Sequence, residues 1–404
     1  MIIGDDYLIE KLKNQEVTKE NLQEFIKDTA KSNKALISSM NDLRMKISEQ
    51  LRLNKICFLI GNGCSIYAGS KNTNTFNLIN NTNKNFSRIN RVLDELKELD
   101  MEKQLNRLLF LKGYFNLFKE TRKENYLDSI YREAKENLIN NYVNAIDYSK
   151  LNIHETLLLK LRNCNNLSKL HIFSLNYDLI FEYVMDKLLI EYSDGFTGFI
   201  NRIFDPQHFF DNKPKVVKLH GSLNWIEEGI YIKSIQPKFI LKEKCLNLDV
   251  EKNIPLMMIY PTSNKLYQTY NTPYSELMRY MLDSLRTDNN ILFVIGYKYG
   301  DEHINEIIKK SLVNPNNIYY FFDYNCLSSD LSKQNGSINK TDQVNFLTYI
   351  KDVSEKTSNI NIIQGKNLAS FEFFVNYIFP AAAEKTDEEK LIKILDEMRE
   401  KYAK

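Results

Sequence analysis

An uninterrupted run of apolar residues at positions 56–60 (ICFLI) restricts the fold of this chain more than any other feature of its sequence. Such a short continuous run is typical of a β-strand that is buried on both faces, as in a parallel sheet covered by helices. The run ends in Gly61-Asn62-Gly63, which predicts a tight turn where the strand leaves the sheet.

Similar strand signals recur further along the chain, and helical periodicity lies between them. We expect strands at 171–174, 215–219, 256–260, 291–295, 318–322 and 359–363. We expect helices at 177–189, 274–286, 302–312 and 368–378. The alternation predicts an α/β fold with a Rossmann-like, mostly parallel sheet, large helical insertions and helical termini.

The same patterns divide the chain into three parts. Residues 1–54 are expected to form an N-terminal helical region, and residues 55–380 a central α/β domain with a helical insertion at about 88–165. Residues 381–404 are expected to form a C-terminal helix, which begins with a capping box of Thr386 and Glu389.

Charge and cysteine usage exclude several classes of protein. The 404 residues include 54 basic and 52 acidic side chains, a balance that gives no case for direct nucleic-acid binding. No apolar run approaches the ~20 residues that a membrane helix needs, and the charged N-terminus does not resemble a signal peptide. The five cysteines are scattered and form no CxxC pair, so we expect a cytoplasmic protein without a bound metal.

The first candidate site follows the apolar run at 56–60. Gly61 and Gly63, followed by Cys64 and Ser65, can let the backbone approach a phosphate at the start of the next helix. Ile66 stands where the third glycine of a G-x-G-x-x-G motif would be. An ordinary strand-to-helix turn therefore explains these glycines equally well.

Polar residues also follow two later strands. Asn176 and Asp178 come after the strand at 171–174, and His220 comes after the strand at 215–219. Side chains at the carboxyl ends of parallel strands lie where such folds bind ligands, and histidine exchanges protons near neutral pH. The alternatives are helix capping by Asn176 or Asp178, and a structural role for His220.

The last two strands are followed by further candidates. Gly296 and Tyr297 begin a loop that leads to Asp301, which is expected to cap the next helix. Asp323, after the strand at 318–322, can meet the hydroxyls of a ribose, although turn formation explains it equally well.

Taken in order, these motifs resemble the sirtuin family over about residues 55–325, and most closely its bacterial branch, whose members consume NAD in antiphage defence. The resemblance implies that the central domain binds NAD as a substrate, and that Gly61, Gly63, Cys64 and Ser65 hold its phosphates. It also implies that the ribose-binding loop begins at Gly296.

Catalytic roles follow from the resemblance as well. Asn176 and Asp178 match the Asn and Asp of the strand that lines the nicotinamide pocket, and His220 matches the catalytic histidine. Three departures from protein-deacylating sirtuins concern the acyl-lysine groove. The four-cysteine zinc module is missing, Leu175 stands where they have Gln, and Gly69 leads to Ser70-Lys71-Asn72-Thr73 where they have Pro-Asp-Phe-Arg. Water is therefore the expected acceptor.

We accordingly expect an NAD hydrolase that releases nicotinamide and ADP-ribose and depletes NAD during abortive infection. The alternatives are an NAD-dependent deacylase or ADP-ribosyltransferase, and a non-catalytic subunit that senses NAD or ADP-ribose. The presence of both Asn176 and His220 favours an enzyme, because binding alone does not require a proton acceptor. The helical additions are candidates for contacts in a homo-oligomer or with a trigger protein, for which the resemblance suggests a HerA-type DNA translocase.

Overall fold

The computed structural model describes residues 2–3, 34–70, 84–97, 99, 101–142, 145–164, 167–236, 238–240, 245–247, 256–259, 269–287, 289–325 and 342–380. Within the expected N-terminal helical region, α3 spans Lys34–Leu53, and residues 4–33 lie outside the described residues. The expected C-terminal helix at 381–404 also lies outside them.

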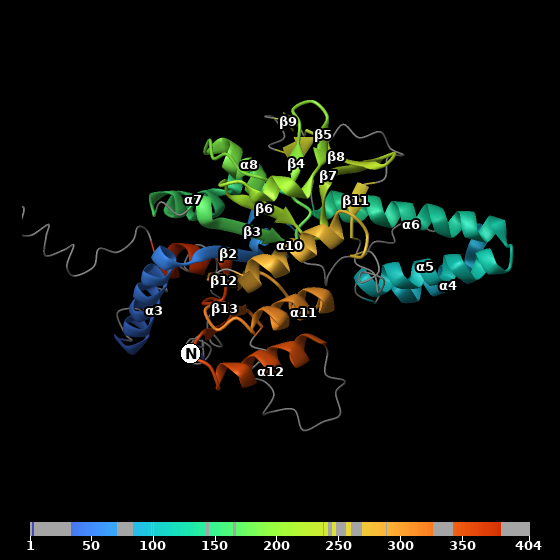
Figure 1. Cartoon of the computed structure of the whole chain (residues 1–404). Coiled ribbons are helices and arrows are strands. Elements are labelled where there is room, and N and C mark those ends of the chain that lie inside the picture. Colours follow the sequence, from blue (N-terminus) through green and yellow to red (C-terminus); the bar gives the residue numbers. More distant parts are fainter. Residues whose placement is uncertain are drawn as a thin grey trace, which may run out of the picture.

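A seven-stranded, all-parallel sheet forms the centre of the molecule (Figure 1). Its spatial order is β1-β14-β13-β12-β2-β3-β6. The strands span Ile2–Ile3 (β1), Lys55–Ile60 (β2), Leu170–Ser174 (β3), Lys215–Lys218 (β6), Asn290–Ile295 (β12), Ile318–Asp323 (β13) and Ile360–Gln364 (β14). The sheet confirms the predicted α/β class and all but one of the predicted strands.

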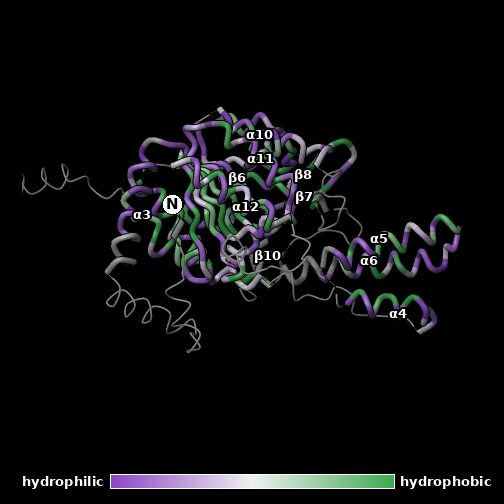
Figure 2. Tube along the Cα trace, turned by 90° about the horizontal axis from the view of Figure 1, so that it is seen from below, coloured by the Kyte–Doolittle hydropathy of each residue, from purple (hydrophilic) through white to green (hydrophobic). Residues whose placement is uncertain are grey.

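Helices cover both faces of this sheet because successive side chains of a strand point to opposite faces. In β2, Phe58 and Ile60 pack with α3, α7 (Asn152–Asn163) and α8 (Ile180–Lys187). Cys57 and Leu59 pack on the other face with α10 (Tyr274–Thr287), α11 (Glu302–Ser311) and α12 (Asp342–Ser354). Each fully buried aliphatic or aromatic side chain contributes roughly 1.5–3 kcal/mol. Figure 2 shows hydrophobic residues gathered in these central strands.

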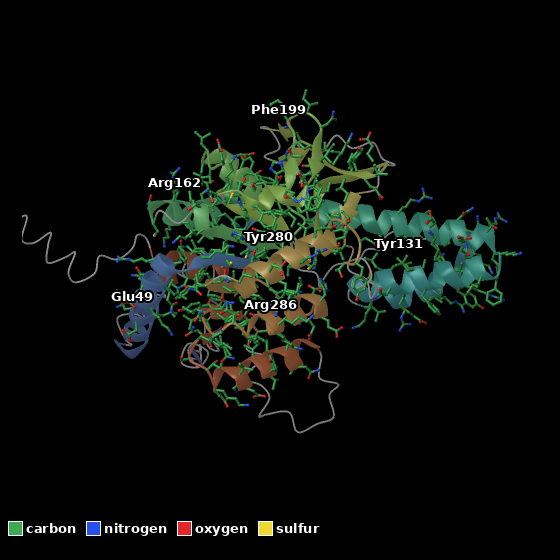
Figure 3. The ribbon with its side chains drawn as sticks, in the orientation of Figure 1. Glu49, Tyr131, Arg162, Phe199, Tyr280 and Arg286 are labelled. Carbon is green, nitrogen blue, oxygen red and sulfur yellow. The ribbon has the colours of Figure 1, made fainter. Side chains whose placement is uncertain are left out.

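The expected helical insertion contains α4 (Ser87–Leu96), α5 (Met101–Leu117) and α6 (Thr121–Tyr142), which extend away from the sheet (Figure 1). Figure 3 marks this extension with Tyr131 on α6 and the opposite side of the molecule with Glu49 on α3. The three helices have a hydrophobic core of their own, which also includes Leu223 and Met258. Those two residues belong to a second sheet.

This second sheet has five antiparallel strands in the order β11-β7-β8-β5-β4. Its strands span Phe196–Thr197 (β4), Arg202–Phe204 (β5), Gly221–Glu228 (β7), Tyr231–Ser234 (β8) and Leu256–Met258 (β11). The strand expected at 256–260 is therefore present as β11, but the prediction that it joins the parallel sheet was wrong. An apolar run specifies a buried strand and does not specify its pairing partner. A separate pair joins β9 (Lys238–Ile240) and β10 (Cys245–Asn247).

Helix boundaries differ from expectation at two places. The helix expected at 177–189 begins only at Ile180, because residues 175–178 leave the strand in an extended segment. The helix expected at 368–378 is shorter and consists of α13 (Phe371–Phe373) and a π-helical turn, η9 (Phe374–Ile378). Short 3₁₀ segments are η1 (Asn62–Cys64), η2 (Ile66–Ala68), η4 (Lys84–Phe86), η5 (Tyr148–Lys150), η6 (Leu167–Lys169) and η7 (Pro206–Phe210). Over the described part of the chain, every helix is too short or too polar to span a bilayer.

His154 of α7 is fully buried between the rings of Phe181 and Phe371, and neither ring nitrogen has a hydrogen-bond partner. Burial lowers the pKa of His154 from 6.5 to about 3, and the backbone near Cys64 offsets only part of this effect. The unfolded chain takes up a proton near pH 6.5, whereas the folded state does not until about pH 3. Stability is therefore lost as the pH falls through this window.

Urea titrations at pH 7 and pH 5 test this prediction. Between these two pH values, the unfolding free energy of the wild type should fall by about 2 kcal/mol more than that of His154→Phe. The Phe variant should lose less because its ring takes up no proton on unfolding. His208→Phe, which changes an exposed histidine, is the control and should respond to pH like the wild type. Equal losses in His154→Phe and the wild type would contradict a neutral His154.

Candidate active site

The strand order of the parallel sheet reverses between β2 and β12. When its strands, without the two-residue edge strand β1, are numbered by their order along the chain, the spatial order from β6 to β14 is 3-2-1-4-5-6. This is the order of dinucleotide-binding α/β folds, in which ligands bind beyond the carboxyl ends of the strands where the order reverses. Gly61 follows β2 at this point, and Gly296 follows β12.

The two glycine loops contact each other closely. The Gly61 amide donates to the Ile295 carbonyl (3.1 Å), and the Gly63 amide donates to the Gly296 carbonyl (2.9 Å). A Cβ atom on Gly61 would lie 2.4 Å from the Gly296 oxygen, and one on Gly63 would lie 2.7 Å from the Gly296 Cα. Packing between the loops thus requires these glycines, whatever ligand binds above them.

Gly61→Ala is expected to lower the unfolding free energy by about 1–3 kcal/mol, the usual cost of forcing extra volume into a packed site. Backbone atoms surround the new methyl group, so they cannot move aside as a side chain would. Gly113→Ala in α5 is the control, because a Cβ there meets no atom within 4 Å. The control should be unchanged or stabilised by up to about 1 kcal/mol. Thermal and urea unfolding of both variants measure the effect. Equal stability of Gly61→Ala and Gly113→Ala would show that the Gly61 loop accepts a Cβ atom.

Cys64 and Ser65 face the protein interior. The Cys64 thiol is fully buried near the Ile295 carbonyl, and burial, together with the nearby Asp178, raises its pKa well above the usual value. A ligand can therefore meet only the backbone of Cys64. The Ser65 hydroxyl donates to Asp178 Oδ2 (2.7 Å) and accepts from Asn176 Nδ2 (2.9 Å), so Ser65 connects the two residues of the next strand.

Asn176 is held in one orientation by this loop. Its side-chain NH₂ donates to the Gly61 carbonyl (3.2 Å) as well as to Ser65 Oγ. A backbone carbonyl can only accept, so the NH₂ group must lie on this side. Both amide protons are used, and Oδ1 has no donor among the described residues. Asn176 therefore presents an acceptor oxygen for a hydroxyl group or a water molecule.

Asp178 supports this arrangement. Its Oδ2 atom accepts from Ser65, and its Oδ1 atom accepts from the Ile180 amide (3.2 Å) at the start of α8. Both oxygens therefore have structural partners, and Asp178 positions Asn176 through Ser65. The sequence left helix capping open for both residues. Asp178 does accept from the first amide of α8, whereas the Asn176 side chain binds the Gly61 loop.

A buried ion pair lies beneath Asp178. Lys218 Nζ donates to the Asp178 carbonyl and lies 3.6 Å from Glu182 Oε1. The two side chains are 3% and 13% exposed, so the ammonium and carboxylate groups compensate each other away from solvent. Burial raises the pKa of Glu182, and Lys218 opposes this shift. This pair fixes the end of β6 against α8.

His220 lies beside Asn176 in the sheet register. Ser174 of β3 pairs with Lys218 of β6, and Asn176 and His220 each follow two residues later. His220 is buried, and its carbonyl accepts from the Ile259 amide (2.8 Å). Its Nε2 atom lies 3.0 Å from Nε2 of His303, near the start of α11. The sequence did not single out His303, although its place two residues after Asp301 was a usable signal.

The remaining candidates line the ends of β12 and β13. The Tyr297 hydroxyl accepts from the Asp301 amide (2.9 Å) and lies 3.1 Å from the Asp301 carbonyl. Burial raises the pKa of Tyr297 well above its usual value, so the phenol stays neutral. Asp301 occupies the expected N-cap position of α11, but its carboxylate makes no capping hydrogen bond. Asp323 is buried and accepts from Gln364 Nε2 (3.3 Å) of the neighbouring strand.

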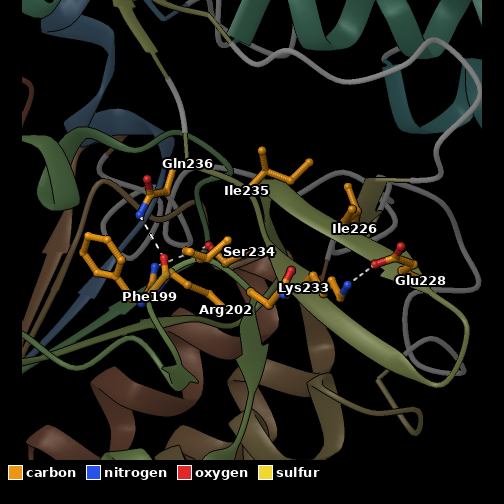
Figure 4. A pocket seen from close by; sticks show the side chains of 10 residues that line it. Phe199, Arg202, Ile226, Glu228, Lys233, Ser234, Ile235 and Gln236 are labelled. Atoms are coloured by element: carbon orange, nitrogen blue, oxygen red, sulfur yellow. Dashed lines mark hydrogen bonds and ion pairs between the residues drawn. The ribbon is translucent and has the colours of Figure 1, made fainter.

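A separate hollow of about 490 Å³ lies on the antiparallel sheet (Figure 4). Its charged residues are already paired, Arg202 with Asp194 and Lys233 with Glu228. No residue of the Asn176–His220 site lines this hollow. In the described ranges, no three His, Cys, Asp or Glu side chains are grouped as metal ligands would be.

One family model matches part of the chain. Residues 170–335 match the family model described as a SIR2-like domain, a range that contains Asn176, His220, Gly296, Asp301 and Asp323. This part of the chain is therefore similar to a SIR2-like domain. The matched range begins after the Gly61 loop. No curated protein matches the chain by sequence.

Two solved structures are similar to the chain. One is described as a Sir2 homolog–NAD complex, with 10% identity, a TM-score of 0.36, and coverage of 76% of this chain and 94% of that chain. The other is a Sir2 homologue mutant–ADP ribose complex, with 10% identity, a TM-score of 0.33, and coverage of 77% and 97%. The ligands named in these descriptions belong to those two proteins.

Proposed function

We propose that this protein is an NAD hydrolase that cleaves the bond between nicotinamide and ribose. The observation that carries the proposal is that Asn176 and His220 each lie two residues beyond the paired ends of β3 and β6, with Asn176 bonded to the Gly61 loop. A SIR2-like domain with an acceptor oxygen and an imidazole at this edge has the groups that such a reaction needs.

In this reaction, the bond from the ribose C1′ to the pyridinium nitrogen breaks, and its electron pair leaves with neutral nicotinamide. A water oxygen bonds to C1′, which yields ADP-ribose, and the proton of that water passes to His220 and then to solvent. Asn176 Oδ1, fixed by Gly61 and Ser65, accepts a hydrogen bond from the water or from a ribose hydroxyl and so positions it.

Incubation of the purified protein with NAD, followed by chromatography, tests the proposal. Free nicotinamide and ADP-ribose in equal amounts are expected, with both lost in Asn176→Ala. Acetyl-ADP-ribose formed with an acetylated peptide would indicate a deacylase, and a labelled protein target would indicate an ADP-ribosyltransferase. NAD binding in calorimetry without turnover would favour a sensor.

The proposed biological role is NAD depletion in antiphage defence within the cytoplasm. The resemblance to the bacterial branch of the sirtuins supports this role. Such an activity must be restrained before infection, so we propose a homo-oligomer that a trigger protein activates, for example a HerA-type DNA translocase. Co-purification from cells that express both proteins tests this partner, and recovery of the chain alone would contradict it.

A further inference from the structure

The hydrogen bond between His220 and His303 joins two residues that are 83 positions apart in the chain. Their Nε2 atoms are 3.0 Å apart, and their ring centroids are 5.2 Å apart. The Ile259 amide holds the His220 backbone, and the contact with His303 holds the ring.

A hydrogen bond between two imidazole nitrogens contains one hydrogen atom. A neutral imidazole donates through one nitrogen and accepts through the other, so one Nε2 atom carries the shared proton and the other supplies a lone pair. Protons on both Nε2 atoms would place two N–H groups against each other and break the contact. The pair can therefore accept one proton while it stays intact.

The role proposed for His220 fixes the direction of this hydrogen bond. A His220 ring that takes a proton from water on Nδ1 must carry hydrogen on Nε2, so Nε2 of His303 is then the acceptor. His303 is the second residue of α11, where the partial positive charge of the helix N-terminus favours a neutral ring.

We propose that His303 is a positioning residue that fixes the ring orientation and tautomer of His220, an inference that rests on the hydrolase function proposed above. With Nε2–H donated to His303, neutral His220 has its lone pair on Nδ1, which is the atom that takes the proton of the attacking water. His303 stabilises the resulting cation without touching the substrate.

Steady-state kinetics of His303→Ala and His303→Gln test this role. The Ala variant should lose about 10- to 100-fold in kcat, as when an orienting partner of a functional imidazole is removed, with KM within about threefold. The Gln variant should recover most of kcat, because its amide oxygen can accept the same hydrogen bond. His208→Gln, at an exposed histidine, should be unaffected. A loss confined to KM, or no rescue by Gln, would overturn the proposal.

Nuclear magnetic resonance of ¹⁵N-histidine-labelled wild type tests the contact without any turnover. A ¹⁵N–¹⁵N coupling across the hydrogen bond should join one nitrogen of each ring, and it should vanish in His303→Gln. Absence of this coupling in the wild type would refute the role of His303 even if the protein hydrolyses NAD. If the coupling is present but no nicotinamide forms, the proposed function fails, whereas the pairing of the two rings stands.

Discussion

Replacement of His220 with alanine should lower kcat for nicotinamide release from NAD by about 10²–10⁴-fold, the usual contribution of a general base. His220 follows β6 at the same distance from the paired strand ends as Asn176 follows β3, and it is the imidazole that we assign to accept the proton of water. The fold should persist, because the side chain of His220 contacts His303 at the edge of the sheet and does not belong to the hydrophobic cores. Rates should be measured at saturating NAD, with thermal unfolding of the same samples.

His208→Ala is the matched control, since it removes an exposed imidazole from η7. Its kcat should equal that of the wild type. Turnover by His220→Ala within about threefold of the wild type would remove His220 from the reaction. A fall in the melting temperature that accompanies the lost activity would instead assign His220 a structural role.

Replacement of Lys218 with methionine should lower the unfolding free energy by about 3–5 kcal/mol, the cost of leaving one member of a buried ion pair without its partner. Lys218 is the cation that lies 3.6 Å from Glu182, and its ammonium group also donates to the Asp178 carbonyl. Without Lys218, burial should raise the pKa of Glu182 further, because its compensating cation is removed. Urea unfolding at pH 7 measures the loss.

The double variant Lys218→Met with Glu182→Met separates this explanation from a packing defect. Two apolar side chains in place of a buried pair are commonly neutral or stabilising, so the double variant should recover most of the loss. A double variant as unstable as Lys218→Met would show that the Asp178 carbonyl, and not the ion pair, requires Lys218.

The residues that could be predicted from the sequence share one property: their signal is local. Short, mostly apolar runs identified β2, β3, β6, β12, β13 and β14, because a strand buried on both faces is predominantly apolar. Buried polar residues at the ends of these strands, such as Lys215 and Lys218 of β6, are exceptions to this pattern. Candidate site residues emerged for the same reason, since glycines and polar side chains directly follow these runs. The run at 256–258 carried the same signal and belongs to the antiparallel sheet, which shows where local information ends.

Several features of the site depend on pairs that are distant in sequence. The Asn176 amide is oriented by Gly61 and Ser65, more than 100 residues earlier, and His220 is paired with His303. Asp301 illustrates the limit in the other direction. Its N-cap position was predicted from the sequence, but the lack of a capping hydrogen bond from its carboxylate was not, because that depends on the local geometry around α11.

The sequence by itself determined the α/β class, most of the strands and helices, and the sirtuin-like order of the motifs, because periodicity and turn residues act over a few positions. Only the tertiary structure decided the strand order that places Gly61 against Gly296, the network that turns Asn176 Oδ1 outward, and the contact of His303 with His220. The physical reason is that strand pairing and side-chain hydrogen bonds join residues whose separation along the chain leaves no periodic trace.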